Sequence, residues 1–70
     1  MNATEVLVAL RKWRQKKLAQ ALEKSIDHQA YLVFKKSIDF MYDELYHHAK
    51  LYILGYPTTY NPKECTIAVQ

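Results

Sequence analysis

One heptad pattern constrains this chain more than any other feature of its sequence. Large apolar side chains and one histidine recur at alternating spacings of three and four residues, at Tyr31, Phe34, Ile38, Met41, Leu45, His48 and Tyr52. Side chains at these spacings lie on one face of an α-helix and form the seam along which helices pack. Gly55 occupies the next heptad position and Pro57 follows it, which is typical of a helix C-terminus. The pattern therefore predicts a helix over about residues 28–54 with a long apolar face.

A preceding helix is predicted over about residues 3–24. Asn2 can cap its first turn, and Glu5 stands three residues later to complete a capping box. Apolar side chains along this segment recur at helical spacing. Ser25 and Asp27 are both competent N-caps, so a break between the two helices is expected there. Because no glycine or proline enforces a turn at this break, one long continuous helix is an alternative.

The C-terminal tail carries mixed signals. Asn61 followed by Pro62 is typical of a helix start, because asparagine caps the first turn and proline suits the first helical position. Thr66 and Ile67, in contrast, favour a strand. We expect a short C-terminal helix or turn over about residues 62–69, packed across the two longer helices.

Length and composition restrict both the fold and the function. The 70 residues include one glycine, two prolines and one cysteine, too few for a glycine-rich phosphate loop, a disulfide scaffold or a zinc finger. The predicted fold class is all-α, a helical hairpin that forms a single domain over residues 1–70. A chain this short buries only about 60% of its unfolded surface. Self-association into a homo-oligomer, or binding to a partner protein, is therefore expected to supply further burial.

The sequence predicts neither a secretory signal nor a transmembrane segment. The first residues lack the basic region and the apolar core of a signal peptide. No uninterrupted apolar run exceeds five residues, whereas a membrane-spanning helix needs about 20. We therefore expect a cytoplasmic protein in which Cys65 is a free thiol.

The excess positive charge is concentrated in the first predicted helix. The chain carries a net charge of +3, yet residues 1–24 alone carry six basic and two acidic side chains. Clustered basic groups bind phosphates, and an aromatic ring such as Trp13 can stack on a base. An acidic protein or an anionic membrane surface is a further possible ligand. Helical geometry, however, spreads the charges around the rod, which favours a solvated helix face; the basic residues concerned are Arg11, Lys12, Arg14, Lys16 and Lys17.

No catalytic, metal or cofactor site is predicted. His47 and His48 are adjacent and so point about 100° apart on a helix. Asp43 and Glu44 lie four residues before them, so each of two helix faces carries one carboxylate and one histidine. Two ligands are too few for a metal site unless two copies of the helix meet across a symmetry axis. No nucleophile accompanies these groups, so acid–base catalysis is not expected. The seam position of His48 suggests a buried polar group that specifies helix pairing.

An apolar, tyrosine-rich surface on the second predicted helix is the candidate protein-binding site. Exposed tyrosines are enriched at protein interfaces, although a flank covered by the other helix accounts for them equally well. The candidate partner-binding residues are Tyr31, Phe34, Ile38, Met41, Tyr42, Leu45, Tyr46 and Tyr52. The sequence favours a non-enzymatic regulatory protein that acts by binding another protein. The alternative is a nucleic-acid-binding accessory protein that uses the basic first helix.

The N-terminal third of the chain also resembles a known family. Segment 2–20 begins Asn-Ala-Thr-Glu-Val-Leu and ends Lys-Leu-Ala-Gln. It resembles the start of the cytoplasmic lysis-inhibition proteins, or antiholins, of T-even-type phages. The whole chain, which is small, glycine-poor and rich in lysine and tyrosine, is similar to accessory proteins of large tailed phages. The resemblance implies a cytoplasmic inhibitor that binds the cytoplasmic part of a holin and delays lysis, and it transfers no residue roles.

Overall fold

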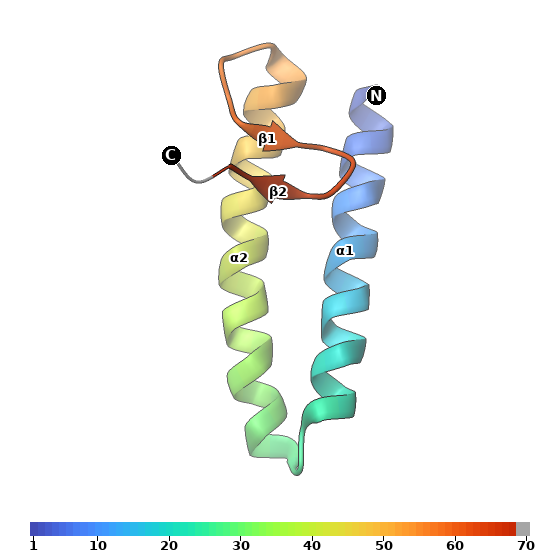
Figure 1. The fold of residues 1–70 in the computed structure, drawn as a ribbon, viewed down its shortest axis with the longest axis vertical. Helices are drawn as coiled ribbons and strands as arrows, with labels where there is room; N and C mark the ends of the chain where they lie inside the picture. Colours follow the sequence, from blue (N-terminus) through green and yellow to red (C-terminus); the bar gives the residue numbers. More distant parts are fainter. Residues whose placement is uncertain (69–70) are drawn as a thin grey trace.

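The computed structural model describes residues 1–68, most of which form two antiparallel helices (Figure 1). Helix α1 spans Ala3–Lys24 and helix α2 spans His28–Leu54, with a short connection at residues 25–27. The predicted helical hairpin is therefore confirmed at the expected boundaries, and the single continuous helix does not form. The chain is mostly helical, with a small two-stranded tail.

Local hydrogen bonds explain where both helices begin and end. The Asn2 side chain accepts a hydrogen bond from the Glu5 N–H at 2.8 Å, and Asp27 accepts one from the Ala30 N–H at 2.8 Å. Each bond satisfies a first-turn donor that the helix itself leaves unpaired. Gly55 ends α2 at φ +82°, in the left-handed region that glycine adopts without strain.

The tail is a β-hairpin. Strand β1 (Tyr60–Asn61) pairs antiparallel with strand β2 (Thr66–Ile67), and residues 62–65 form the turn between them. Of the two forms expected over residues 62–69, the turn is present and the helix is not, as far as residue 68. Position 69 lies outside the described residues.

The physical reason for this difference lies in the side chain of Asn61. Its carboxamide oxygen accepts hydrogen bonds from the N–H groups of Lys63 at 3.0 Å and Glu64 at 3.3 Å. The same contacts can start a helix or a turn. Here Cys65 takes φ +51° after the turn, which reverses the chain and returns it to pair with β1.

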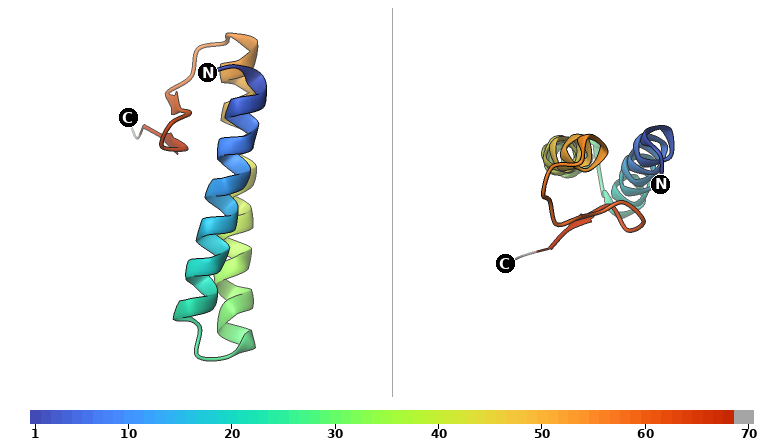
Figure 2. Two further views of the ribbon diagram at one scale, coloured as in Figure 1. Left: turned by 90° about the vertical axis from the view of Figure 1, so that its right-hand side faces the viewer. Right: turned by 90° about the horizontal axis from the view of Figure 1, so that it is seen from above.

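The β-hairpin crosses one face of the helical pair, near the start of α1 and the end of α2 (Figures 1 and 2). The hydrophobic core is concentrated beneath it and consists of Val6, Leu10, Leu45, Ala49, Tyr60 and Cys65. Nearer the connection between the helices, the buried apolar side chains of residues 1–68 are Ala21 and Ile38. One end of this face is thus covered by the tail, and the other end is left open.

Candidate protein-binding groove

An open cleft lies beside β2, where the β-hairpin meets the helical pair. It has a volume of about 340 Å³, and α1, α2 and the tail all contribute to its walls. Lys17 and Glu44 place one charge of each sign at its edge. The lining residues are Trp13, Lys17, Met41, Glu44, Leu45, Cys65, Thr66 and Ile67.

The apolar surface continues from this cleft along α2 toward the connection between the helices. Phe34 lies seven residues before Met41 and therefore shares its side of the helix. The two side chains are 43% and 39% exposed, although both belong to the predicted seam. Helix α1 covers the other side of the seam, where Ile38 and Leu45 are each only 7% exposed. We call the cleft together with Phe34 the apolar groove.

The structure divides the predicted partner-binding residues into two groups. Five are buried or half-buried, namely Tyr31, Ile38, Tyr42, Leu45 and Tyr52. Three remain exposed, namely Phe34, Met41 and Tyr46. Of these three, Tyr46 stacks on Tyr42 with ring centroids 6.2 Å apart, whereas Phe34 and Met41 belong to the apolar groove. Of the eight predicted residues, Met41 and the buried Leu45 line the cleft itself, and Phe34 extends the groove along α2.

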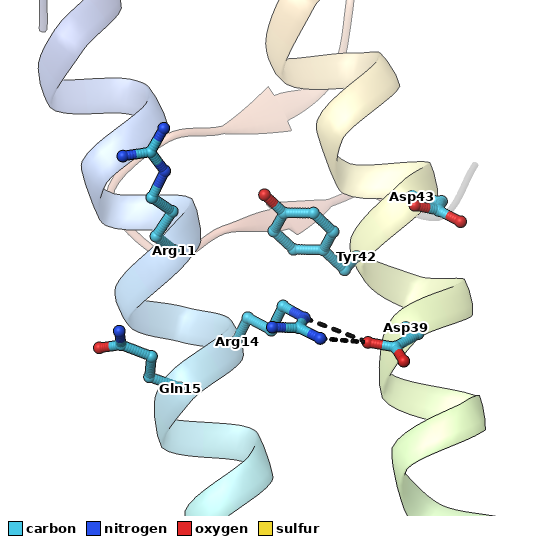
Figure 3. Close-up of a pocket in the computed structure, with 6 residues that line it drawn as sticks. All are labelled: Arg11, Arg14, Gln15, Asp39, Tyr42 and Asp43. Atoms are coloured by element: carbon cyan, nitrogen blue, oxygen red, sulfur yellow. Dashed lines mark hydrogen bonds and ion pairs between the residues drawn. The ribbon is translucent and has the colours of Figure 1, made fainter.

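One member of the basic run is held by an acidic partner on the other helix (Figure 3). The Arg14 guanidinium donates to Asp39 Oδ1 from Nε at 3.1 Å and from Nη2 at 2.9 Å, and Lys35 Nζ donates to Asp39 Oδ2 at 2.9 Å. The hydrogen bonds from Lys35 and from Arg14 hold the pKa of Asp39 below its ordinary value. The Arg14 guanidinium also lies 5.6 Å from the Tyr42 ring centroid. Arg14 therefore connects the two helices.

The other basic side chains do not form one continuous surface with Arg14. Lys17 lines the apolar groove, whereas Arg11 and Arg14 border a second cleft of about 450 Å³ on the face opposite the β-hairpin (Figure 3). Lys12 and Lys16 are exposed and lie one turn apart on the outer side of α1. The positive charges are thus spread over three sides of α1, which gives a nucleic acid little continuous basic surface.

The two adjacent histidines have different surroundings. His48 Nδ1 and Thr58 Oγ1 share a hydrogen bond at 3.2 Å, which ties α2 to the segment before β1. His47 is exposed and lies with Phe40 at the edge of a separate hollow on α2. Within residues 1–68, no three His, Cys, Asp or Glu side chains lie close enough together to hold a metal ion.

Two tail residues that were not predicted as site residues complete the core beneath the groove. Tyr60 and Cys65 are each 5% exposed, and the Tyr60 ring meets Tyr52 edge-on with centroids 6.2 Å apart. The Tyr60 hydroxyl has no hydrogen-bond partner among residues 1–68. Burial, together with the neighbouring Cys65 side chain, raises the pKa of this hydroxyl above its ordinary value. The strand preference of Thr66 and Ile67 was the available signal for this arrangement.

Comparison with known proteins assigns no family to this chain. No family model matches it, and neither a curated protein nor a solved structure does. The class that the fold and the groove define is a small helical hairpin, one end of which is covered by a β-hairpin. None of the helices described in residues 1–68 combines the length and the apolarity needed to cross a lipid bilayer.

Proposed function

We propose that this chain is a non-enzymatic regulatory protein that binds a segment of another protein in the apolar groove. The observation that carries the proposal is the exposure of Phe34 and Met41 beside a cleft with mainly apolar walls. Within residues 1–68, twelve large apolar side chains are exposed while only eight apolar residues are buried. Contiguous exposed apolar surface is typical of interaction sites.

The shape of the groove favours a short amphipathic helix as its ligand. A helix laid along α1 and α2 would occupy the face that the β-hairpin leaves open, with anchor side chains on successive turns. The stretch from Phe34 to Met41 is about 10 Å long at 1.5 Å per residue, which suits two or three helical turns. Lys17 and Glu44 could orient such a ligand through opposite charges.

The resemblance of segment 2–20 to T-even-type antiholins supports a specific partner. On this proposal the chain acts in the cytoplasm of a phage-infected bacterium. It binds the cytoplasmic segment of a holin in the apolar groove and so delays permeabilisation of the membrane.

Groove variants with a matched control test this proposal. Phe34→Lys and Met41→Lys place a charge in the apolar groove, whereas Val8→Lys makes the same change at a 38% exposed position of α1 outside it. Each variant is co-expressed with a T-even-type holin, and the time to lysis is measured. Wild type and Val8→Lys should delay lysis, and both groove variants should not. A delay that both groove variants retain would contradict binding in the groove, and no delay by wild type would remove the holin as partner.

A further inference from the structure

A second apolar line runs along the side of α2 that points away from α1. It consists of every seventh position, namely Ile26, Val33, Phe40, His47 and Leu54. Its four apolar members are the most exposed large apolar side chains within residues 1–68, at 94%, 70%, 68% and 67%. Seven residues make about two helical turns, so the four members within α2 share one face, roughly 160° around the helix from Ile38, and Ile26 lies just before them in the connection. We call this set the outer line.

Two hollows beside Phe40 have the composition of holes in a coiled coil. The first, of about 570 Å³, is lined by Val33, Lys36, Ser37 and Phe40. The second, of about 340 Å³, is lined by Phe40, Asp43, Glu44, His47 and His48. In coiled coils a side chain of one helix enters a hole formed by four residues of the facing helix, and residues at i, i+3, i+4 and i+7 form such a hole. The outer line thus offers both knobs and holes to a helix with the same spacing.

We propose that a second copy of this chain covers the outer line, with the two α2 helices antiparallel and Phe40 at the two-fold axis. Residues of the outer line that are equally far before and after position 40 then face each other across the interface, and each flank of α2 meets the same flank of the second copy. Val33 meets His47 of the second copy, and Leu54 lies level with the connection that holds Ile26 of that copy. The Phe40 rings of the two copies pack side by side at the centre.

The charges beside the outer line select this antiparallel orientation. Lys36 and Asp43 lie on the same flank, both exposed, and neither forms an ion pair within residues 1–68. In the antiparallel arrangement Lys36 faces Asp43 of the second copy, and this pair forms twice. A parallel arrangement would instead bring opposite flanks together at the same height, placing Lys36 against Ser37 and Asp43 against Glu44 of the second copy, and the two carboxylates would repel. On the other flank the antiparallel arrangement sets Ser37 against Glu44, a hydrogen-bonding pair.

The size of the outer line fits a reversible dimer. Helix α2 has 27 residues, which corresponds to a strip about 40 Å long, about 10 Å wide and roughly 400 Å² in projection. Stable interfaces bury about 800 Å² of each partner. We therefore expect association that depends on concentration. The apolar groove lies on another side of α2 and has only Glu44 in common with this interface.

Sedimentation equilibrium of the full chain, from about 10 μM to about 1 mM, tests the dimer. The wild type should move from its monomer mass of 8.3 kDa toward twice that value. Phe40→Glu should stay at the monomer mass, and Phe34→Glu, which lies on the groove side, should associate as the wild type does. Circular dichroism should show unchanged helix content in both, because each position is exposed.

Exchange of the flanking charges tests the orientation. Lys36→Glu should weaken association about threefold to tenfold, because it removes two ion pairs and sets the introduced carboxylate against Asp43 of the second copy. Adding Asp43→Lys should restore it. The proposal is overturned if the wild type stays at 8.3 kDa or if Phe40→Glu still associates. It is also overturned if the double variant Lys36→Glu with Asp43→Lys dimerises no more tightly than Lys36→Glu alone. Each result is separate from groove binding, because Phe40 does not line the groove.

Discussion

The unpaired hydroxyl of Tyr60 leads to a prediction of unusual sign, namely that Tyr60→Phe stabilises the protein. The side chain is 5% exposed, and its hydroxyl has no hydrogen-bond partner among residues 1–68. A buried polar group without a partner costs about 1–3 kcal/mol. Phenylalanine keeps the edge-on contact with Tyr52 and removes this cost, less a small loss for the vacated volume. We expect the free energy of unfolding to rise by about 1 kcal/mol and the Tm by about 4–8 °C.

Urea and thermal denaturation followed by circular dichroism measure both quantities. Tyr56→Phe is the matched control, because Tyr56 is 61% exposed and its hydroxyl reaches water; its effect should stay within about 0.5 kcal/mol. The raised pKa of Tyr60 adds a second readout. Above about pH 10 the Tyr60 hydroxyl stays protonated in the folded state but loses its proton in the unfolded state, so the free energy of unfolding of the wild type should fall as the pH rises. The free energy of unfolding of Tyr60→Phe should fall less over the same pH range. A Tyr60→Phe variant less stable than the wild type would refute the reasoning, since the hydroxyl would then have a partner in solution.

Three further changes probe the core, the link between the helices and the end of α2. Leu10→Ala removes a fully buried side chain and should cost about 2–5 kcal/mol of the roughly 4–10 kcal/mol expected for a chain of this length, as measured by urea denaturation. Asp39→Asn should be less stable than the wild type above about pH 5. That difference should shrink below about pH 4, because the lowered pKa of Asp39 makes its contribution disappear as the carboxylate becomes protonated, which denaturation over a pH series tests. Gly55→Ala should destabilise by about 1 kcal/mol in thermal melts, although no atom obstructs the new methyl group, because φ is +82°.

The helices could be predicted because their signals are local. Asn2 and Asp27 each cap a helix through a residue three positions later, and Gly55 supplies the left-handed end of α2. The seam spacing also placed Ile38 and Leu45 correctly in the contact between the helices. None of these features depends on residues far away in the sequence.

The tail and the groove depend on contacts between distant residues, which local signals do not determine. Asn61 makes the same kind of hydrogen bond in a helix cap and in a turn, and the pairing of Tyr60 with Ile67 together with the burial of Tyr60 on the helices decides between them. The groove wall formed by Ile67 could not be anticipated without this pairing. The exposure of Phe34 likewise follows from having one neighbouring helix on the seam rather than two.

The claim that a protein segment binds in the apolar groove is tested most directly by affinity capture from the native host with nuclease-treated extracts. The wild type and Val8→Lys should recover the same partner protein, and Phe34→Lys and Met41→Lys should each lose it. Recovery that disappears after nuclease treatment, or that both groove variants retain, would contradict the claim. The first of these results would favour a nucleic acid on the basic side chains of α1 instead.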